Sequence, residues 1–156
     1  QQFGALVPRA EAQAALATGV ARHFGADAAR FGLDQALPQA EQAQREADQK
    51  ANHCNAMPDE MLPMLVDFQR LRDPSLAAAA EQAWRQTGGP VVVITGNGHA
   101  RRDRGLVVYL HRAAPELRVL SLGQMEAGQI EGDFDVTYSS PAVVRPDPCL
   151  AFRTSD

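Results

Sequence analysis

The sequence predicts an α/β protein in which a mostly parallel sheet is flanked by helices and follows an α-helical N-terminal half. In residues 1–87, apolar side chains recur every three to four positions and alanine is abundant, which is typical of helices. From Pro90 onward the pattern changes to short apolar runs. The first run, Val91–Ile94, is continuous and β-branched, as expected of a parallel strand that is buried on both faces.

Length and charge limit the domain organisation and the classes of partner. The 156 residues correspond to a single domain or a fragment, with a helical half at 1–87 and a strand-turn-helix-strand half at 88–156. We interpret the start at Gln1 as that of a fragment or processed chain. The net charge of −4, with no basic face or tail, argues against nucleic acid, because phosphate binding needs a concentrated Lys/Arg surface.

Four segments of the helical half precede Asp73. Pro8–Phe24 predicts an amphipathic helix, and Asp27–Leu33 predicts a short second turn. Gln39–Ala51 is almost wholly polar, which is typical of a solvated helix or a surface connection, and Pro38 is suited to open a helix there. His53–Arg72 is the densest apolar segment and predicts a helix.

A break or kink is expected at Asp73–Pro74, because proline cannot donate the backbone hydrogen bond that a helix needs. Asp73 would then cap the alanine-rich helix over Ser75–Thr87, which Gly88-Gly89-Pro90 ends. In the second half we expect a strand, a helix, two strands and an edge strand, at Val91–Ile94, Leu106–Ala114, Leu117–Leu122, Phe134–Tyr138 and Cys149–Arg153.

The turn after the first predicted strand, T-G-N-G-H-A-R-R-D-R-G at Thr95–Gly105, is the main candidate for a binding site. In an open α/β sheet, ligands gather at the carboxyl ends of strands. Gly96 and Gly98 would allow positive φ and a close approach of backbone to ligand. His99 is suited to be a metal ligand, a haem contact or a general base, or simply to cap the next helix.

Polar neighbours extend this candidate site. Asn97 is placed to orient His99 or to bind a ligand. Arg101 and Arg102, with Arg104 nearby, would favour an anionic group at the start of the following helix, although single arginines usually lie on solvated surface. The turn lacks the Lys-Ser/Thr ending of a phosphate-binding loop and the third glycine of a dinucleotide fingerprint.

A second cluster, His53-Cys54 before Met57, carries side chains that bind transition metals or haem iron, and His53 is its best candidate ligand. The alternative is that the methionines there are flexible core residues. Tyr138 ends a predicted strand, and a tyrosine can also bind haem iron. The metal-ligand candidates are thus His99 and His53; we assign no catalytic residue.

Cys54 and Cys149 match no zinc or redox spacing. They are either two small buried residues or the two ends of a long-range disulfide.

Three blocks resemble one family: H-C-N-A-M-P at His53–Pro58, F-Q-R-L-R-D at Phe68–Asp73 and G-N-G-H-A-R-R-D-R-G-L at Gly96–Leu106. Together they resemble the ChaN-like family of iron-regulated, haem-binding lipoproteins of bacterial envelopes. The resemblance implies haem binding in bacterial iron acquisition, near the glycine-rich turn, rather than an enzyme. Arginines of the turn would meet the propionates, and His99, His53 or Tyr138 would hold the iron.

The resemblance also implies a homodimer that closes over haem and a location in the cell envelope, the periplasm or the outer membrane. Membrane attachment would come only through a lipid anchor upstream of Gln1. An oxidising envelope would favour the Cys54–Cys149 disulfide.

One departure from the family is the missing G-E-x-H-D-like segment that members usually carry near their start. The chain also resembles the TraB and erythromycin-esterase-like proteins, which suggests an alternative function as a hydrolase. In that case His99 would be the base or a metal ligand, and an acidic partner would come from the missing segment.

Overall fold

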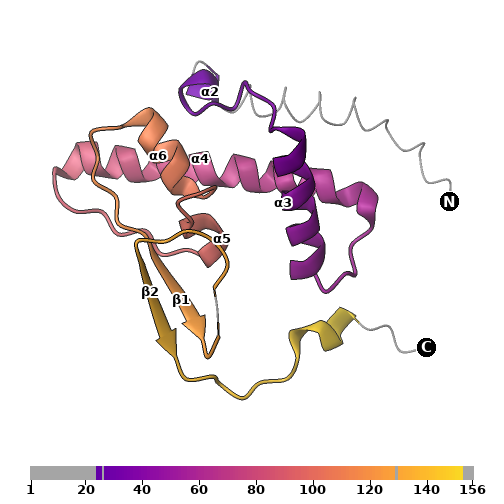
Figure 1. Ribbon diagram of the computed structural model, residues 1–156. Helices are drawn as coiled ribbons and strands as arrows, with labels where there is room; N and C mark the ends of the chain where they lie inside the picture. The colour runs from indigo at the N-terminus through magenta and orange to yellow at the C-terminus, as the bar shows by residue number, and fades with distance from the viewer. Residues whose placement is uncertain (1–23, 26, 129, 153–156) are drawn as a thin grey trace. The chain divides into compact units, whose positions relative to one another are not determined.

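The computed structural model describes residues 24–25, 27–128 and 130–152, and it confirms the predicted class of mixed helix and strand with a helical N-terminal half (Figure 1). The helix predicted over Pro8–Phe24 lies outside the described residues, apart from its last position. The chain divides into two compact units: residues 1–29, 33–68 and 148–156 form the first, and residues 30–32 and 69–147 form the second. None of the described helices is long and apolar enough to cross a membrane.

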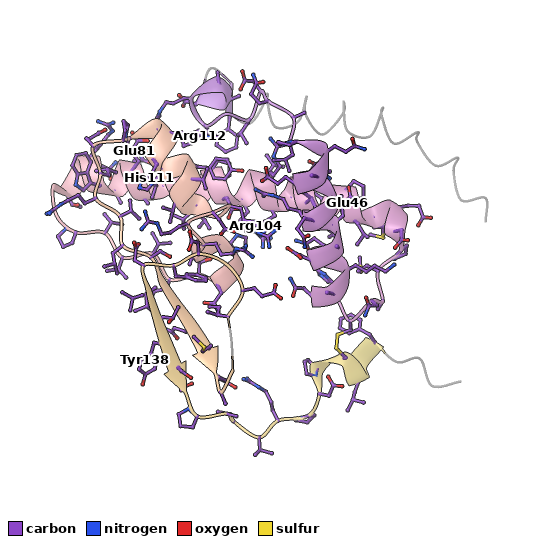
Figure 2. The ribbon with its side chains drawn as sticks, viewed as in Figure 1. Glu46, Glu81, Arg104, His111, Arg112 and Tyr138 are labelled. Carbon is purple, nitrogen blue, oxygen red and sulfur yellow. A yellow bond between two sulfur atoms is a disulfide. The ribbon has the colours of Figure 1, made fainter. Side chains whose placement is uncertain are left out.

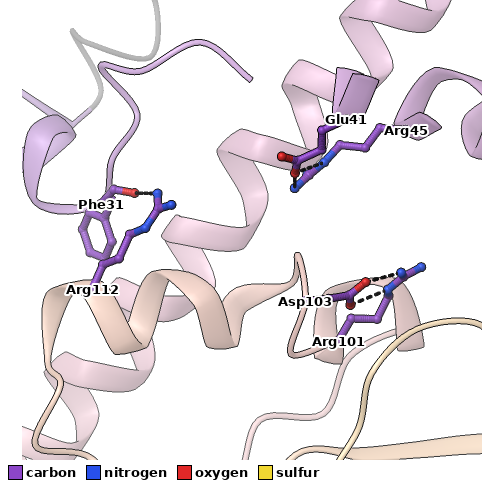
Figure 3. A network of polar contacts seen from close by, with 6 residues as sticks. All are labelled: Phe31, Glu41, Arg45, Arg101, Asp103 and Arg112. Atoms are coloured by element: carbon purple, nitrogen blue, oxygen red, sulfur yellow. Dashed lines mark hydrogen bonds and ion pairs between the residues drawn. The ribbon is translucent and has the colours of Figure 1, made fainter. Parts of the chain in front are cut away.

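The polar segment after Pro38 is a helix, α3 (Gln39–Asn52), and Pro38 is its N-cap, one residue before the first helical position at which it was expected. Side-chain contacts between residues one turn apart stabilise this helix. Arg45 donates to Glu41, with 2.6 Å between Nη2 and Oε1 (Figure 3). Such pairs support a helix whose sequence offers little apolar surface to bury. The short helix α2 (Asp27–Arg30) precedes α3 and lies where the second turn was predicted.

A disulfide joins Cys54 to Cys149 within the first unit. Cys54 and Asn55 both have positive φ, at 59° and 57°, in the turn that follows α3. Cys149 lies in a 3-10 helix, η2 (Pro148–Phe152), so the edge strand predicted over Cys149–Arg153 is wrong. Proline favours the first position of a helical turn, which explains why the segment turns rather than extends.

Helix α4 (Leu62–Thr87) follows the 3-10 helix η1 (Asp59–Met61) and continues through Pro74, so the predicted break is wrong. Pro74 and Asp73 are fully buried, and this packing outweighs the hydrogen bond that proline cannot donate. The hydroxyl of Ser75 also donates to the carbonyl of Leu71 at 2.8 Å, one turn back. Gly88 ends the helix with a φ of 65°, as predicted.

Two parallel strands, β1 (Leu122–Glu126) and β2 (Val136–Ser140), form the sheet, with Leu122 opposite Val136. They begin later than the predicted strands at Leu117–Leu122 and Phe134–Tyr138. The preceding helix α6 (Leu106–Ala113) agrees with the prediction and buries an apolar stripe that consists of Leu106, Val107, Tyr109 and Leu110.

The apolar run Val91–Ile94 is not a strand, which corrects the prediction. Val92 and Ile94 are 83% and 94% exposed, and no described segment pairs with this run. A strand exists only where a neighbour accepts its backbone hydrogen bonds, so β-branched composition alone does not produce one. The short helix α5 (Asn97–Ala100) follows directly.

Glu81 of α4 is a buried acid with two arginine partners, Arg30 and Arg85. The Nη2 atom of Arg85 lies 2.7 Å from Oε1 of Glu81. Burial alone would raise the pKa of Glu81, but hydrogen bonds from Arg85 and Arg30 and the charges of both arginines hold that pKa below its ordinary value of 4.5. The ionised form of Glu81 is therefore stabilised in the folded state relative to the unfolded state.

We expect reduction of the disulfide to lower the free energy of unfolding by about 4 kcal/mol, because a cross-link over a long loop restricts the unfolded chain. The two cysteines are separated by 95 positions. Urea denaturation with and without reductant measures the difference. The double variant Cys54→Ser, Cys149→Ser should match the reduced protein and show no effect of reductant; an unchanged midpoint on reduction would contradict the expectation.

Replacing the buried acid, Glu81→Gln, should lower the free energy of unfolding by about 1–3 kcal/mol at pH 7, because two arginines lose their charged acceptor. The folded pKa of Glu81 lies below 4.5. Its stabilisation is therefore fully present above that pH and is lost as the pH falls through the folded pKa. The difference in urea midpoint between wild type and variant should therefore be smaller at pH 3 than at pH 7. A gap that stays constant with pH would show that charge does not carry the effect.

Candidate functional site

The glycine-rich turn forms α5 and the loop before α6, but different glycines matter than predicted. Gly96 has a φ of −69°, and Gly98 does not adopt positive φ either. Gly105 is the constrained position, because a Cβ atom there would lie 2.3 Å from the carbonyl oxygen of His99 and 2.6 Å from that of Arg101. Glycine is therefore needed where the chain leaves the turn.

His99 is held by an acid that the sequence interpretation assigned to another role. Its Nδ1 atom lies 2.6 Å from Oδ1 of Asp73, whose side chain is fully buried, while the side chain of His99 is 18% exposed. Asp73 thus lies inside α4 and does not cap a helix, so that prediction is wrong. Its place directly before Pro74 is the feature that favoured a helix cap instead.

Asn97, the first residue of α5, binds the sheet through its side chain. Its Nδ2 atom donates to the carbonyl of Gln124 at 2.6 Å, and its Oδ1 accepts from the backbone N–H of Gln124 at 3.1 Å. The side-chain amide thereby pairs with β1 as a neighbouring strand would. Tyr138 is opposite Gln124 across the sheet and is 61% exposed on β2 (Figure 2). The structure therefore places Asn97 and Tyr138 on either side of one residue of β1.

The first two arginines of the turn are engaged by carboxylates. Arg101 donates to Asp103, with 2.8 Å between Nε and Oδ1, and this hydrogen bond holds the pKa of Asp103 below its ordinary value (Figure 3). Arg102 pairs with Asp135, and its backbone N–H donates to the carbonyl of Asp133 at 2.8 Å. These cations hold the loops around the turn together.

A groove of about 900 Å³ adjoins this turn within the second unit. Residues 88–95 and 116–122 line it together with side chains of α4 and α6, and Asn97 and Ala100 of α5 lie at its margin. Most of its lining is apolar, and the volume is in the range of pockets that hold small ligands. Arg118 lines the groove, is exposed and has no ion pair in the described part of the chain. The sequence signal that could have identified Arg118 is its place between apolar residues in L-R-V-L-S-L, at Leu117–Leu122.

His53 belongs to the first unit. Its Nδ1 atom lies 2.8 Å from the carbonyl oxygen of Gln49. Because a carbonyl only accepts, Nδ1 carries the hydrogen and the neutral ring keeps a lone pair on Nε2. Within residues 24–25, 27–128 and 130–152, no three His, Cys, Asp or Glu side chains are grouped to hold a metal ion.

Comparison with known proteins gives one match. The model of a family described as haem-binding uptake, Tiki superfamily, ChaN matches residues 1–110 of the chain. No curated protein and no solved structure matches it significantly.

We expect Asn97→Ala to raise the exchange rate of the Gln124 amide hydrogen by about tenfold or more, because that amide loses its acceptor at the open edge of β1. Hydrogen exchange followed by NMR measures it. Asn97→Asp is the matched control, since its carboxylate still accepts from Gln124 and should preserve most of the protection. Equal exchange in wild type and Asn97→Ala would contradict the pairing.

Proposed function

We propose that this chain, which belongs to the ChaN family of haem-binding uptake proteins in the Tiki superfamily, binds haem as cargo in the groove beside α5. The observation that carries this proposal is the apolar groove that opens next to the turn of the family motif. Haem is a large, flat, mostly apolar ligand with two carboxylates at one edge. The groove offers apolar walls for the ring and a cation for that edge.

The cation is Arg118. Arg101 and Arg102, which the sequence interpretation offered to the propionates, already pair with Asp103 and Asp135. Arg118 lines the groove itself, and a guanidinium can bind a carboxylate through two parallel hydrogen bonds. We therefore assign the propionate contact to Arg118.

Our first candidate for the iron ligand is His99, which is not itself a lining residue of the groove but directly precedes the lining residue Ala100 on α5. Its Nδ1 is taken by Asp73, so Nε2 is the nitrogen left for a metal. Gly96, Gly98 and Asn97 shape the turn that carries it. Tyr138, exposed on β2, and His53, whose Nε2 is also left, are the alternatives. Imidazole and phenolate are both known axial ligands of haem iron.

Cellular context follows from the disulfide and the groove. A structural disulfide is typical of an oxidising compartment, which supports a bacterial envelope location for this uptake protein. An open groove leaves one face of a bound haem in contact with solvent. We propose that a second copy covers that face in a homodimer.

A haemin titration followed by the Soret band tests the proposal. We expect saturable binding to wild type, weakened about tenfold or more in His99→Ala, which loses the metal ligand. Arg118→Ala should also weaken binding, by about 1–3 kcal/mol, through loss of a charge-assisted contact. His111→Ala is the matched control, because His111 is an exposed histidine on the neighbouring helix α6 (Figure 2).

Other results of this titration would change the assignment of the haem site or contradict haem binding. Binding that survives His99→Ala but fails in Tyr138→Phe or His53→Ala would move the iron ligand to that residue. Binding that no variant weakens would remove the groove and its turn as the site. No saturable binding by wild type would contradict haem binding by this chain.

A second candidate, hydrolysis, has one supporting observation. The buried Asp73 carboxylate orients His99, and an acid–imidazole pair of this kind can serve as a general base. The acidic partner that the alternative required is thus present within this chain. Turnover of p-nitrophenyl esters that is lost in His99→Ala would favour it, and a colourless protein without turnover or haem uptake would contradict both functions.

A further inference from the structure

We infer that the outer edge of β2 is a surface for self-association, on which a second copy of this chain adds its own β2 in antiparallel orientation. The inference concerns the protein without haem and does not rest on the proposed function. The outer edge is the side of β2 away from β1, whereas the groove is lined by residues of β1 and none of β2. This contact is therefore separate from the one that would cover a bound haem.

The outer edge of β2 carries backbone groups without a partner. The N–H of Val136 donates to the carbonyl of Ser121 at 3.1 Å, so the backbone of Val136 faces β1. Because backbone groups alternate in direction along a strand, Thr137 and Ser139 direct their N–H and C=O groups away from β1. No strand in the described part of the chain pairs with that side, and Figure 1 shows β2 at the margin of the sheet.

This edge lacks the features by which free edges usually resist pairing. Residues 136–140, V-T-Y-S-S, contain no charged residue and no proline. Charges, especially lysine, and prolines are what normally prevent a further strand from adding to an edge. Val136 and Tyr138 are 43% and 61% exposed, so an added strand would also remove apolar area from water (Figure 2). The edge is therefore suited to accept a strand.

The charges on either side of β2 favour a second copy as the source of that strand. Glu131 and Asp133 precede β2 and have no ion pair within the described residues, while Arg145 follows β2. In an antiparallel pair, the segment after one β2 runs beside the segment before the other, so opposite charges would meet at both ends. Arg145 is 61% exposed, and its pair with Glu126 leaves further N–H donors for a second carboxylate. A parallel pair would place like charges together instead.

One register of the antiparallel pair uses every outward backbone group. If Tyr138 lies opposite its own copy on a two-fold axis, Thr137 of each chain exchanges both backbone hydrogen bonds with Ser139 of the other. An axis at Ser139 would set Thr137 opposite Pro141, which has no N–H. An axis at Thr137 would set Ser139 opposite Asp135, whose N–H already donates within its own chain. The axis at Tyr138 also brings the two phenol rings together as a cross-strand pair.

Hydrogen exchange in the haem-free wild type tests this register directly. We expect the amide hydrogens of Thr137 and Ser139 to exchange about tenfold or more slowly at millimolar than at low micromolar protein, because only the dimer gives them acceptors. Val136 and Tyr138 are internal controls, since their amides are bonded to β1 and should not change. Protection that rises at all four residues alike, or at none, would overturn the pairing.

Sedimentation of wild type and variants measures the dissociation constant of the dimer. Thr137→Pro removes an N–H that points away from β1, so it should leave the β1–β2 ladder intact. It should raise the dissociation constant about tenfold or more, because each copy loses one donor. Thr137→Val keeps the N–H and is the matched control. A monomer at every concentration, or a dimer that Thr137→Pro does not weaken, would overturn the inference; if that variant fails to fold, exchange in wild type still decides.

A charge exchange tests the second copy and its orientation. Arg145→Glu alone, and Glu131→Lys with Asp133→Lys alone, should each weaken the dimer about threefold or more, because like charges then meet at both ends. An equimolar mixture of the two proteins should dimerise again, since each end of the mixed dimer pairs opposite charges. No recovery in the mixture would overturn the antiparallel arrangement.

Haemin separates this surface from the proposed haem site. The dimer should form without haemin, and one that appears only with haemin would belong to the groove and overturn this inference. Tyr138→Phe should preserve the dimer, because the ring is retained, whereas loss of haemin binding in that variant would concern only the iron ligand. Failure of wild type to take up haemin would contradict the proposed function and leave the exchange and sedimentation tests unaffected.

Discussion

The hydrogen bond between Asp73 and His99 is the contact on which the second unit depends. It joins the middle of the long helix α4 to the short helix α5, and the side-chain amide of Asn97 then joins α5 to β1 through two hydrogen bonds with the backbone of Gln124. β1 in turn pairs with β2 along its other edge. A single buried polar contact therefore stands at the start of a series that extends from the helical layer to the sheet. Buried polar contacts of this kind define one arrangement of a fold more sharply than apolar packing does.

Function follows from the same arrangement. The segments that form the walls of the groove, 88–95 and 116–122, each run from a helix to an element that these contacts fix: 88–95 leads into α5, and 116–122 leads into β1. The groove is therefore as well defined as the contact between α4 and α5. Its apolar lining and the exposed Arg118 give it the character of a site for an apolar ligand with an anionic edge. Asn97 and Ala100 of α5 line the groove, and the candidate ligand His99 precedes Ala100 in the chain but is not itself a lining residue.

Helices were predicted from the sequence more accurately than strands, for a physical reason. The apolar stripe of α6 and the proline that precedes α3 are local signals, and each is visible within a few residues. Parallel pairing is not local. Val91–Ile94 has the composition of a strand but no partner in the described chain, while β1 begins only at Leu122, the first residue whose partner is Val136. A strand's limits are properties of two segments, and one segment alone does not contain them.

The site shows the same division. His99 and Asn97 could be singled out because a turn after an apolar run is a recognisable context. Asp73 could not, because local rules favour an acid before proline as a cap, and only tertiary packing shows that α4 passes through Pro74. Gly105 was overlooked for a similar reason. Only glycine fits at this position, because a Cβ atom would collide with the carbonyl oxygens of His99 and Arg101. The positions of those two carbonyls depend on the folded turn.

Pro74 has a dynamic consequence for its neighbour in the chain. A proline inside a helix has no N–H to donate to the carbonyl one turn earlier. Helix α4 therefore lacks one backbone hydrogen bond at Pro74, directly after Asp73. Helices open first where their hydrogen bonding is weakest. Transient opening of α4 there would withdraw the carboxylate from the imidazole and release the ring. The frequency of that local opening, rather than the overall stability of the protein, would then set how often the imidazole of His99 is free to rotate.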